Sequence, residues 1–596
     1  MTPVSSHSGL AVLRPYLVLV AAVLLTYANT LAGGFVWDDN LFTANQAYWT
    51  YDLKAIFFSL ANSLEYQPVR DLTFLADIAL WGERPLGFHL TNLLLFTLVV
   101  ILVYRLAARL HCWYRDGDAA AEPETFVPLA TALLFALHPL RSEVVAWVTQ
   151  RNTLLATLFC LLSLLLYCRY LEGERGERGV LAGSIAAFVL ALFSKAIVVI
   201  LPLLLLLLSG CRRGGKRFPV LALLPYFAVS AAAAGLHIAI ARQTTVISAA
   251  YGASLVERGA IALQIPFFYL KKTLLPTGLS AFYPDLFSRS LTSLPVLLGG
   301  VLLLAVTAVV WRLRRRLPEL AFGYGWFMIT LLPVSNLFAT SPVVADRYLF
   351  LPAIGPCFTV AALLGRLATA GSVRRGITVA GILLLVVLAA MTHGRNRVWQ
   401  SDIALWSDTA LRSPGVAGIW YNLARAWHRT TRLGLALDAY LRAVTLDPRD
   451  QKALDNAAAL FPAALGSLAE RKELVAGLAG QMPPPPAGLA LIGHTDRPWS
   501  RPEAAEALFL RLLEMDRESV ELRLALANLY LKVGAAERAT AIYADIRGSG
   551  GGRGEAEFGL GRIAAASGDR GAAAELVAIA RQKGGVPESL LRLVVN

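Results

Sequence analysis

The chain has 596 residues and a formal net charge of +14, and 56% of its residues are hydrophobic. It is too long for one domain and too apolar for an ordinary soluble protein. The positive charge does not indicate nucleic-acid binding, because the arginine and lysine clusters stand in short loops between apolar runs. This pattern is typical of the cytoplasmic loops of membrane proteins.

Apolar runs recur through the first two thirds of the sequence. A helix needs about 20 apolar residues to cross a bilayer, so the runs predict an all-α, polytopic helix bundle of about eleven spans. The predicted spans are 14-32, 88-110, 126-138, 151-170, 179-194, 196-210, 219-241, 292-311, 320-338, 348-366 and 376-392. With the N-terminus and the basic loops inside, an odd number of spans puts the following region on the opposite side. Residues 261-275 are apolar but carry Lys271 and Lys272, and we interpret them as an interfacial helix.

Polar residues gather where the predicted spans reach the outer face. In chain order, the five clusters contain Asp38 and Asp39; Arg70, Asp71 and His89; His138, Arg141, Glu143 and Arg151; Lys195; and Asp346, Arg347 and Tyr348. Helix capping would account for Asp39 alone, and snorkelling would account for any single cation. An ionisable group at membrane depth costs free energy, so such groups are retained where they are paired or serve a function. Five clusters on one face therefore favour a shared functional site.

The composition changes near residue 395 to an Ala-, Leu- and Arg-rich sequence with helical periodicity. Residues 417-450 match the TPR pattern of about 34 residues, and 520-553 and 554-587 keep the same period. We therefore predict a transmembrane domain at 1-395 and a TPR domain, an α-solenoid, at 396-596. The topology places the TPR domain on the periplasmic or lumenal side. TPR arrays bind extended peptides in a concave groove, so an acceptor protein or peptide is the expected ligand, with a structural spacer as the alternative.

Several short motifs stand at these polar clusters. They are FVWDD at 35-39, PVRDLT at 68-73, GFHLTN at 87-92, LHP at 137-139, EVVAWV at 143-148, FSK at 193-195 and DRYL at 346-349. Over nearly the whole chain, the motifs and the order of domains resemble the transmembrane and TPR-containing O-mannosyltransferases and their bacterial relatives, which have the GT-C fold. The chain departs from that family at Ala196, where a glutamate often follows the lysine, and at Asp346, which replaces a glutamate.

The resemblance implies an inverting glycosyltransferase that moves a mannose-like hexose from a polyprenyl-phosphate donor to an acceptor, expected to be protein serine or threonine. Transfer is expected on the outer face of a membrane, here the bacterial inner membrane. The acidic residue of the first outer loop in this family serves as catalytic base or acceptor positioner, and it maps to Asp38 or Asp39.

The chemistry of the residues agrees with this mapping. A carboxylate can take the proton of the attacking hydroxyl, so the expected catalytic residues are Asp38 and Asp39, with Glu143 orienting a sugar hydroxyl or an arginine. A phosphate leaving group needs positive charge, and the expected donor phosphate-binding residues are Lys195, Arg347, Arg70 and Arg151. The expected sugar- or acceptor-positioning residues are Asp71, His89, His138, Arg141, Asp346 and Tyr348.

No cofactor is expected besides the lipid-linked sugar, which is a co-substrate. Hard oxygen ligands on Asp38 or Asp39 and Glu143 would suit magnesium or manganese, but we expect no metal because side-chain cations are numerous. Two alternative functions stay open at this point. One is glycosylation of an envelope lipid or glycan, and the other is a non-catalytic membrane scaffold organised by the TPR domain.

Overall fold

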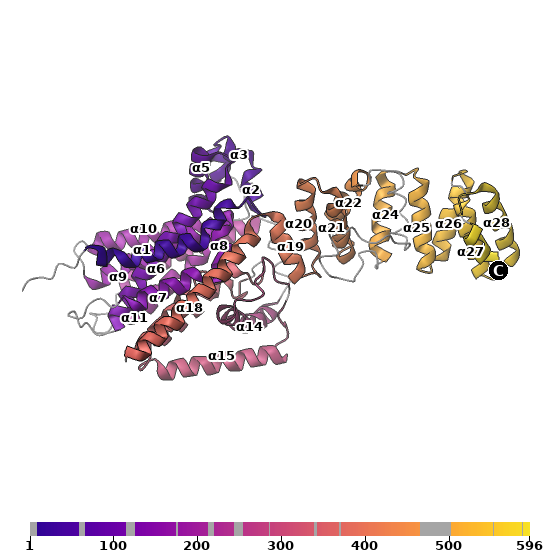
Figure 1. The fold of residues 1–596 in the computed structure, drawn as a ribbon. Helices are drawn as coiled ribbons and strands as arrows, with labels where there is room; N and C mark the ends of the chain where they lie inside the picture. The colour runs from indigo at the N-terminus through magenta and orange to yellow at the C-terminus, as the bar shows by residue number, and fades with distance from the viewer. Residues whose placement is uncertain are drawn as a thin grey trace, which may run out of the picture. The chain divides into compact units, whose positions relative to one another are not determined.

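The computed structural model describes residues 9–58, 66–114, 125–173, 177–211, 220–243, 254–284, 286–338, 342–368, 371–464, 502–515, 517–551, 554–586 and 588–595. Across these ranges the chain forms helices joined by turns and contains no strand (Figure 1). The predicted all-α fold class is therefore confirmed. Contacts divide the chain into two compact units, Met1–Leu405 and Trp406–Asn596, close to the composition change near residue 395.

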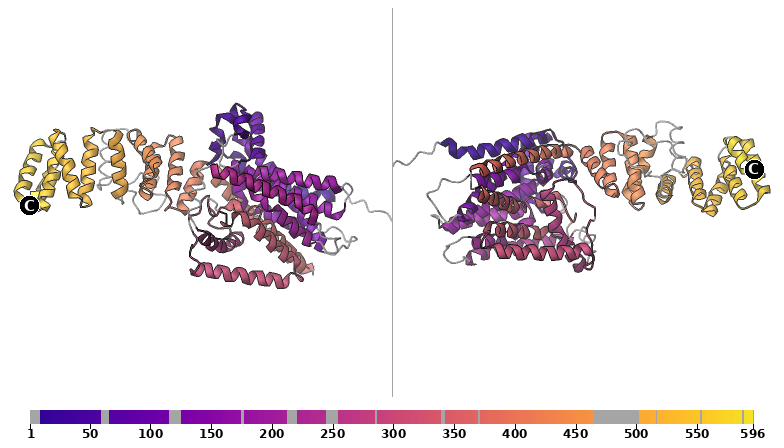
Figure 2. Two further views of the ribbon diagram at one scale, coloured as in Figure 1. Left: turned by 180° about the vertical axis from the view of Figure 1, so that it is seen from behind. Right: turned by 60° about the horizontal axis from the view of Figure 1, so that its bottom comes forward.

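Seven helices of the first unit are long and apolar enough to cross a membrane. They are α1 (Gly9–Tyr27), α6 (Pro85–Tyr114), α9 (Arg151–Glu172), α10 (Glu177–Ser194), α12 (Val220–Gln243), α15 (Leu294–Leu313) and α18 (Gly371–Asn396). Figures 1 and 2 show most of them running side by side, with α15 at the edge of the bundle. These helices indicate a membrane protein.

The remaining predicted spans are helical but shorter or broken. An eighth span results if α7 (Phe126–Leu137) is joined to the helical turns at Pro139–Ala146, across a bend of 61°. The other three predicted spans, 196-210, 320-338 and 348-366, overlap short helices. These are α11 (Leu201–Cys211), α16 (Pro318–Leu331) and α17 (Ile354–Leu367). Seven or eight helices among the described residues thus meet the length of a span, against about eleven predicted. Burial between helices also selects apolar residues, so hydropathy does not distinguish a short core helix from a span.

The connection from α1 to α6 consists of short elements. These are η1 (Ala28–Ala32), α2 (Asp39–Thr43), α3 (Gln46–Trp49), α4 (Leu53–Phe58) and α5 (Pro68–Trp81). Their aromatic side chains form a buried cluster of their own, in which Phe42 stacks on Phe74 and Phe88. Since Phe88 lies in the first turn of α6, this cluster holds the connection against one end of the bundle.

The chain between α7 and α9 is broken into short turns. After α7 come η3 (Pro139–Arg141), α8 (Ser142–Ala146) and η4 (Val148–Gln150), and α9 follows directly. Pro139 has no backbone N–H and cannot continue a helical hydrogen-bond ladder, which explains the end of α7. We call residues 138–153 the broken segment. It contains many of the polar residues singled out in the sequence.

The later part of the first unit combines spans with irregular turns. Helix α14 (Leu255–Leu274) begins with a capping box in which Ser254 and Glu257 bond reciprocally, and it is not among the candidate spans. Its interfacial position stays a prediction. Turns η5 (Ala196–Ile200), η6 (Leu332–Val334), η7 (Asp346–Leu349) and η8 (Arg397–Trp399) complete this unit.

The second unit is a succession of short helices (Figure 2). They are α19 (Asp402–Arg412), which crosses the unit boundary, α20 (Ala417–Arg429), α21 (Leu433–Leu446), α22 (Gln451–Ala464), α24 (Pro502–Met515), α25 (Val520–Lys532), α26 (Ala536–Gly548), α27 (Glu555–Ala566), α28 (Arg570–Lys583) and α29 (Glu588–Val595). Within the predicted TPR domain, residues 465–501, 516, 552–553, 587 and 596 lie outside the described residues.

Each of the three predicted repeats coincides with a pair of packed helices. The pairs are α20 with α21, α25 with α26, and α27 with α28. Gly534 and Gly568 have φ angles of +83° and +87° between the helices of their pairs, a backbone conformation that favours glycine. Ala539 and Ala573 are buried at the helix contacts. The pairs fit a repeat array, and the identification as TPR stays a prediction.

Candidate functional site

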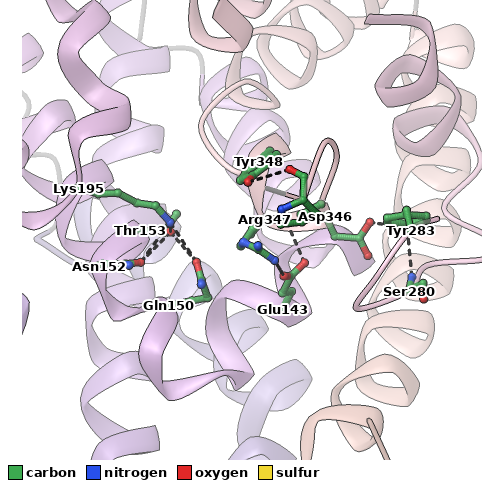
Figure 3. A network of polar contacts seen from close by, with 12 residues as sticks. Glu143, Gln150, Asn152, Thr153, Lys195, Ser280, Tyr283, Asp346, Arg347 and Tyr348 are labelled. Atoms are coloured by element: carbon green, nitrogen blue, oxygen red, sulfur yellow. Dashed lines mark hydrogen bonds and ion pairs between the residues drawn. The ribbon is translucent and has the colours of Figure 1, made fainter. Parts of the chain in front are cut away.

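A carboxylate of the broken segment contacts Arg347 in the distant turn η7. Glu143 on α8 is only 2% exposed, and its Oε1 lies 2.6 Å from Nη1 of Arg347. Its Oε2 accepts a hydrogen bond from the backbone N of Arg347 at 2.9 Å (Figure 3). Both oxygens therefore hold the same residue. This arrangement fixes the arginine side chain and the path of the chain around it.

Aromatic rings surround the Arg347 guanidinium. Its central carbon lies 5.5 Å from the ring centre of Trp147 and 6.0 Å from that of Trp37, and these two rings stack 4.6 Å apart. Burial by itself lowers the pKa of Arg347, but the charge of Glu143, with a smaller contribution from Asp38, raises the pKa above its ordinary value. The arginine is thus held as a cation, and the carboxylate of Asp38 lies within electrostatic reach.

The turn that carries Asp38 has an unusual backbone. Trp37 has a φ of +52°, which a bulky side chain rarely adopts and which costs roughly 1–3 kcal/mol. Its backbone N donates to Oδ1 of Asp402 at 2.7 Å, and its ring stacks on Trp147. These contacts hold the strained turn in place. Asp38 is half-buried there and stays a candidate base.

The neighbouring Asp39 has a different environment. It is fully buried, and its Oδ2 accepts from the backbone N of Val36 at 2.9 Å. Its Oδ1 accepts from Thr149 through the backbone N at 2.8 Å and through Oγ1 at 2.5 Å. Burial raises the pKa of Asp39 to about 7, against the opposing effect of these hydrogen bonds. Both oxygens of Asp39 already have partners, Oδ2 within the first outer loop and Oδ1 in η4, and this does not fit the catalytic role predicted for Asp39.

Lys195 lies in a cradle of neutral oxygens between α10 and η5. Its Nζ is 2.9 Å from Oγ1 of Thr153, 3.3 Å from Oε1 of Gln150 and 3.4 Å from Oδ1 of Asn152 (Figure 3). All three partners belong to the broken segment. These three acceptors orient the ammonium of the half-buried lysine, and the donor phosphate-binding role of Lys195 stays a prediction.

Asp346 and Tyr348 shape the turn on either side of Arg347. Oδ1 of Asp346 accepts a hydrogen bond from the hydroxyl of Tyr283 at 2.7 Å (Figure 3). Burial raises the pKa of Asp346, and the charge of Glu143 raises it further. The hydroxyl of Tyr348 donates to the carbonyl of Pro342 at 3.2 Å. Both residues therefore hold η7 in place, and the sugar- or acceptor-positioning roles predicted for them stay predictions.

Arg151 does not fit the predicted phosphate-binding role. Its side chain is fully buried, and Nη2 lies 2.5 Å from Oδ2 of Asp77. Nε donates to Oδ1 of Asn92 at 2.8 Å, and Nη2 also donates to the carbonyl of Phe88 at 2.9 Å. A guanidinium with these partners ties α5, α6 and α9 together and presents no open face to a ligand.

Arg141 is also a structural cation. It is 1% exposed, and its Nη1 donates to the carbonyls of Leu349 and Phe350, each at 3.0 Å. The guanidinium lies over the ring of Phe135 at 5.0 Å. These contacts clamp η3 to the end of η7, and the sugar- or acceptor-positioning role of Arg141 stays a prediction.

Arg70 and Asp71 pair with each other on α5. Nη2 of Arg70 lies 2.7 Å from Oδ1 of Asp71, which also accepts from the hydroxyl of Tyr48 at 2.9 Å. Both side chains are buried beside the aromatic cluster of the first outer loop. None of the described contacts of this pair joins Glu143 or Lys195, and the phosphate-binding role of Arg70 and the positioning role of Asp71 stay predictions.

The two predicted histidines contact backbone carbonyls. Nε2 of His89 lies 3.3 Å from the carbonyl oxygen of Gly34, and Nε2 of His138 lies 2.9 Å from that of Thr273. His89 thereby joins α6 to the residues just before the strained turn. His138 joins the broken segment to the end of α14.

His138 also lines an apolar cavity of about 390 Å³. The rest of its wall comes from α7, α14, α15, α16, α17 and α18, through apolar side chains such as Phe267, Leu303 and Phe327. The cavity therefore adjoins the same broken segment that carries Glu143. Its volume and lining suit a hydrocarbon chain.

Several residues of the network carry no sequence signal of their own. Thr149, Thr153, Asp77 and Tyr283 are single polar residues whose roles arise only from their partners. Trp147 stood within one of the motifs, but no role followed from its position. Among the described residues, no group of three or more His, Cys, Asp or Glu side chains could hold a metal ion.

Comparison with known proteins gives a consistent class of relatives. No protein-family model matches the chain. A protein O-mannosyl-transferase of Caenorhabditis elegans is 25% identical over 461 residues, which are 73% of this chain and 63% of that protein. The protein O-mannosyl-transferase TMTC4 of Mus musculus is 25% identical over 498 residues, 70% of this chain and 65% of that protein.

A third relative is the protein O-mannosyl-transferase Tmtc3 of Drosophila melanogaster, which is 24% identical over 531 residues, 74% of this chain and 56% of that protein. The chain thus spans less than two thirds of the length of these relatives. Similarity to protein O-mannosyl-transferases agrees with the resemblance found in the motifs. The GT-C fold and the inverting reaction stay predictions.

Proposed function

We propose that this protein is a membrane glycosyltransferase that moves a mannose-like hexose from a polyprenyl-phosphate donor to serine or threonine of an acceptor protein. The observation that carries the proposal is the broken segment. It holds Glu143 against Arg347 and cradles Lys195, so one short stretch positions two cations and a carboxylate. The activity in the names of the relatives supports the same class of reaction.

The proposed reaction is a single displacement. The acceptor hydroxyl oxygen attacks the anomeric carbon, its proton passes to the carboxylate of Asp38, and the bond from that carbon to the phosphate oxygen breaks. The electron pair stays on the polyprenyl phosphate, and attack from the opposite side inverts the anomeric centre. Asp38 is the preferred base because Asp39 is saturated by Val36 and Thr149.

The leaving phosphate needs positive charge and no general acid. Lys195 is half-buried with its ammonium oriented by neutral oxygens, and Arg347 has donors beyond those that Glu143 uses. Because a buried carboxylate already holds the guanidinium in place, little reorganisation energy is needed as charge develops on the phosphate. The apolar cavity beside His138 is our choice for the polyprenyl chain.

The acceptor would bind to the helical repeats of the second unit, which we place on the periplasmic or lumenal side of a bacterial inner membrane. Paired short helices in succession form the kind of array that binds extended peptides. Soluble repeats added in excess should compete for acceptor peptide and slow transfer without changing donor affinity.

The test of the function uses purified protein, a polyprenyl-phosphate mannose with labelled sugar, and membrane or envelope fractions as acceptors. Label should enter protein on hydroxyl residues, and Asp38→Asn should lower the rate at least about 100-fold. The matched control is Asp52→Asn, an exposed aspartate of the same outer loop, which should leave the rate unchanged. Label entering lipid or glycan in place of protein would replace the proposed acceptor, and full activity of Asp38→Asn would remove the proposed base.

A further inference from the structure

Two threonines of the broken segment stand four positions apart and contact different parts of the candidate site. Thr149 in η4 holds Asp39, the neighbour of the proposed base, through its backbone N at 2.8 Å and its Oγ1 at 2.5 Å. Oγ1 of Thr153, in the first turn of α9, lies 2.9 Å from Nζ of Lys195, the proposed phosphate-binding cation. One short stretch therefore reaches both ends of the proposed reaction path.

The contact at Thr149 fixes the turn that carries Asp38. Asp39 is fully buried, and its other carboxylate oxygen accepts from the backbone N of Val36 at 2.9 Å. Asp39 is also the first residue of α2, so its side chain joins the start of this helix to η4. Since Asp38 directly precedes Asp39, a shift of this anchor moves the backbone on which Asp38 stands.

The hydroxyl of Thr153 orients the acceptors around Lys195. It accepts from Nζ of Lys195, and its own proton can go to Oε1 of Gln150 at 2.9 Å or to Oδ1 of Asn152 at 3.1 Å. The side-chain amide of Asn152 donates in turn to Oε1 of Gln67 at 3.0 Å. Thr153 therefore links the other two acceptors that face the ammonium (Figure 3).

The stretch between the two threonines is short and helical. It runs from η4 into the start of α9, and four residues of a 3-10 helix or an α-helix advance about 6–8 Å. Arg151, which lies between them, is fully buried and ties this stretch to α5 and α6. The separation of the two threonine contacts is therefore held by rigid structure.

This separation matters for a displacement reaction. The attacking hydroxyl and the departing phosphate lie on opposite sides of the anomeric carbon, so the base and the phosphate-binding cation must stand at a set distance from each other. Displacement of a catalytic group by about 1 Å can lower a rate about 100-fold. A residue that fixes either group thus affects the rate without touching the substrate.

We propose that Thr149 and Thr153 are positioning residues for the transfer reaction, Thr149 for the base Asp38 and Thr153 for the phosphate-binding cation Lys195. This role rests on the proposed function and adds to it the two side chains that set the distance between base and cation. Each hydroxyl acts through the group that it positions.

The test measures transfer from a labelled polyprenyl-phosphate mannose by the purified full-length protein. Thr149→Val and Thr153→Val remove the hydroxyl and nearly keep the shape of the side chain, and each should lower kcat/KM about tenfold. Thr149→Ser and Thr153→Ser keep the hydroxyl and should retain most of the rate. The matched control is Thr97→Val on α6, whose Oγ1 donates to the carbonyl of Leu93 in the same helix, and it should leave the rate unchanged.

Crossed double variants separate positioning from a general loss of structure, because residues that act as a unit are not additive in kinetics. Thr149→Val should have little further effect in Asp38→Asn and should keep its tenfold effect in Lys195→Met. Thr153→Val should show the reverse pattern. A purely structural defect lowers the rate by the same factor in both backgrounds, and that result would overturn the proposal.

Full activity of either valine variant would also overturn the proposed positioning. This failure is distinguishable from a failure of the proposed function. Absence of transfer by the unchanged protein would refute the function and the positioning role together, whereas transfer by the unchanged protein with fully active valine variants would refute the positioning role alone.

Discussion

The two carboxylate oxygens of Glu143 both hold Arg347, one at 2.6 Å from the guanidinium Nη1 and the other at 2.9 Å from the backbone N. The two residues are 204 positions apart in the chain. This buried ion pair, together with the Arg141 contacts, therefore holds the broken segment against η7 and sets the direction of the Arg347 guanidinium beside the Trp37 and Trp147 rings.

This pair should show strong coupling in a double-mutant cycle. Glu143→Ala or Arg347→Ala alone should each cost about 3–5 kcal/mol of unfolding free energy, because each leaves a buried charge without its partner. The double variant should lose clearly less unfolding free energy than the sum of the losses in the two single variants. Unfolding in detergent with added denaturant measures the three values. The exposed pair Asp408 and Arg412 is the control, with a coupling of no more than about 0.5 kcal/mol; additivity at Glu143 and Arg347 would show that the pair does not act as a unit.

The ionisation of Asp39 should make the free energy of unfolding depend on pH. Burial raises its folded pKa to about 7, while the unfolded value is about 3.9. The folded state therefore holds a proton that the unfolded state loses, so this group makes folding less favourable as pH rises from about 4 to 7. Asp39→Asn removes hydrogen bonds from Val36 or Thr149 and should destabilise the protein, most strongly at low pH, with the deficit shrinking as pH approaches 7.

The measurement is the apparent Tm of both proteins in detergent from pH 4.5 to 8. A constant difference between them across this range would contradict the raised pKa. Asp38→Asn, at a half-buried neighbouring position, serves as the control and should show no comparable trend.

Removal of the Lys195 charge should impair transfer without unfolding the protein. Lys195→Met should lower kcat/KM by about 100- to 1000-fold if the ammonium stabilises the developing phosphate charge. Lys195→Arg should retain part of the activity because it keeps the charge. Donor-dependent product formation measures both variants, and Lys54→Met, on the exposed face of α4, is the matched control. Unchanged kcat/KM in Lys195→Met would exclude this lysine from the phosphate site.

At Gly355, the close contact between α16 and α17 should leave no room for a Cβ atom. A Cβ at Gly355 would lie 2.5 Å from the carbonyl oxygen of Gly323, and backbone atoms cannot yield as a side chain can. Gly355→Ala should therefore cost roughly 1–3 kcal/mol through separation of the two helices. Gly381→Ala on α18 is the control, since no atom lies within 4 Å of its Cβ position, and its Tm should stay equal or rise. Equal Tm values for the two variants would contradict the close contact.

Much of the architecture could be predicted from composition and periodicity. Apolar runs located helices such as α6 and α9, and the spacing of small residues located the helix pairs of the second unit. These features are local, because the apolar face of a helix is formed by residues only three and four positions apart in the chain. The number of membrane spans was harder to predict from the sequence. Helices such as α16 and α17 are apolar because they are packed against each other, and hydropathy does not separate that cause from contact with lipid.

The motifs also indicated which part of the chain holds the candidate site, but they could not rank its residues. Asp38 and Asp39 are adjacent and chemically identical, yet it is Asp39 that is fully buried and accepts two hydrogen bonds from Thr149. Arg151 and Arg347 are both arginines in or beside the motifs, yet Arg151 is fully buried against Asp77, whereas Arg347 pairs with Glu143.

The amino-acid sequence by itself determined that the chain is helical and apolar enough for a membrane, and where its polar residues interrupt the apolar runs. Only the tertiary structure decided which carboxylates and cations are buried and which partners they have. The physical reason is that burial and pairing depend on neighbours far away in the chain, such as Asp39 with Thr149, which are 110 positions apart. The free energy of a charge is set by those neighbours and by the water they exclude.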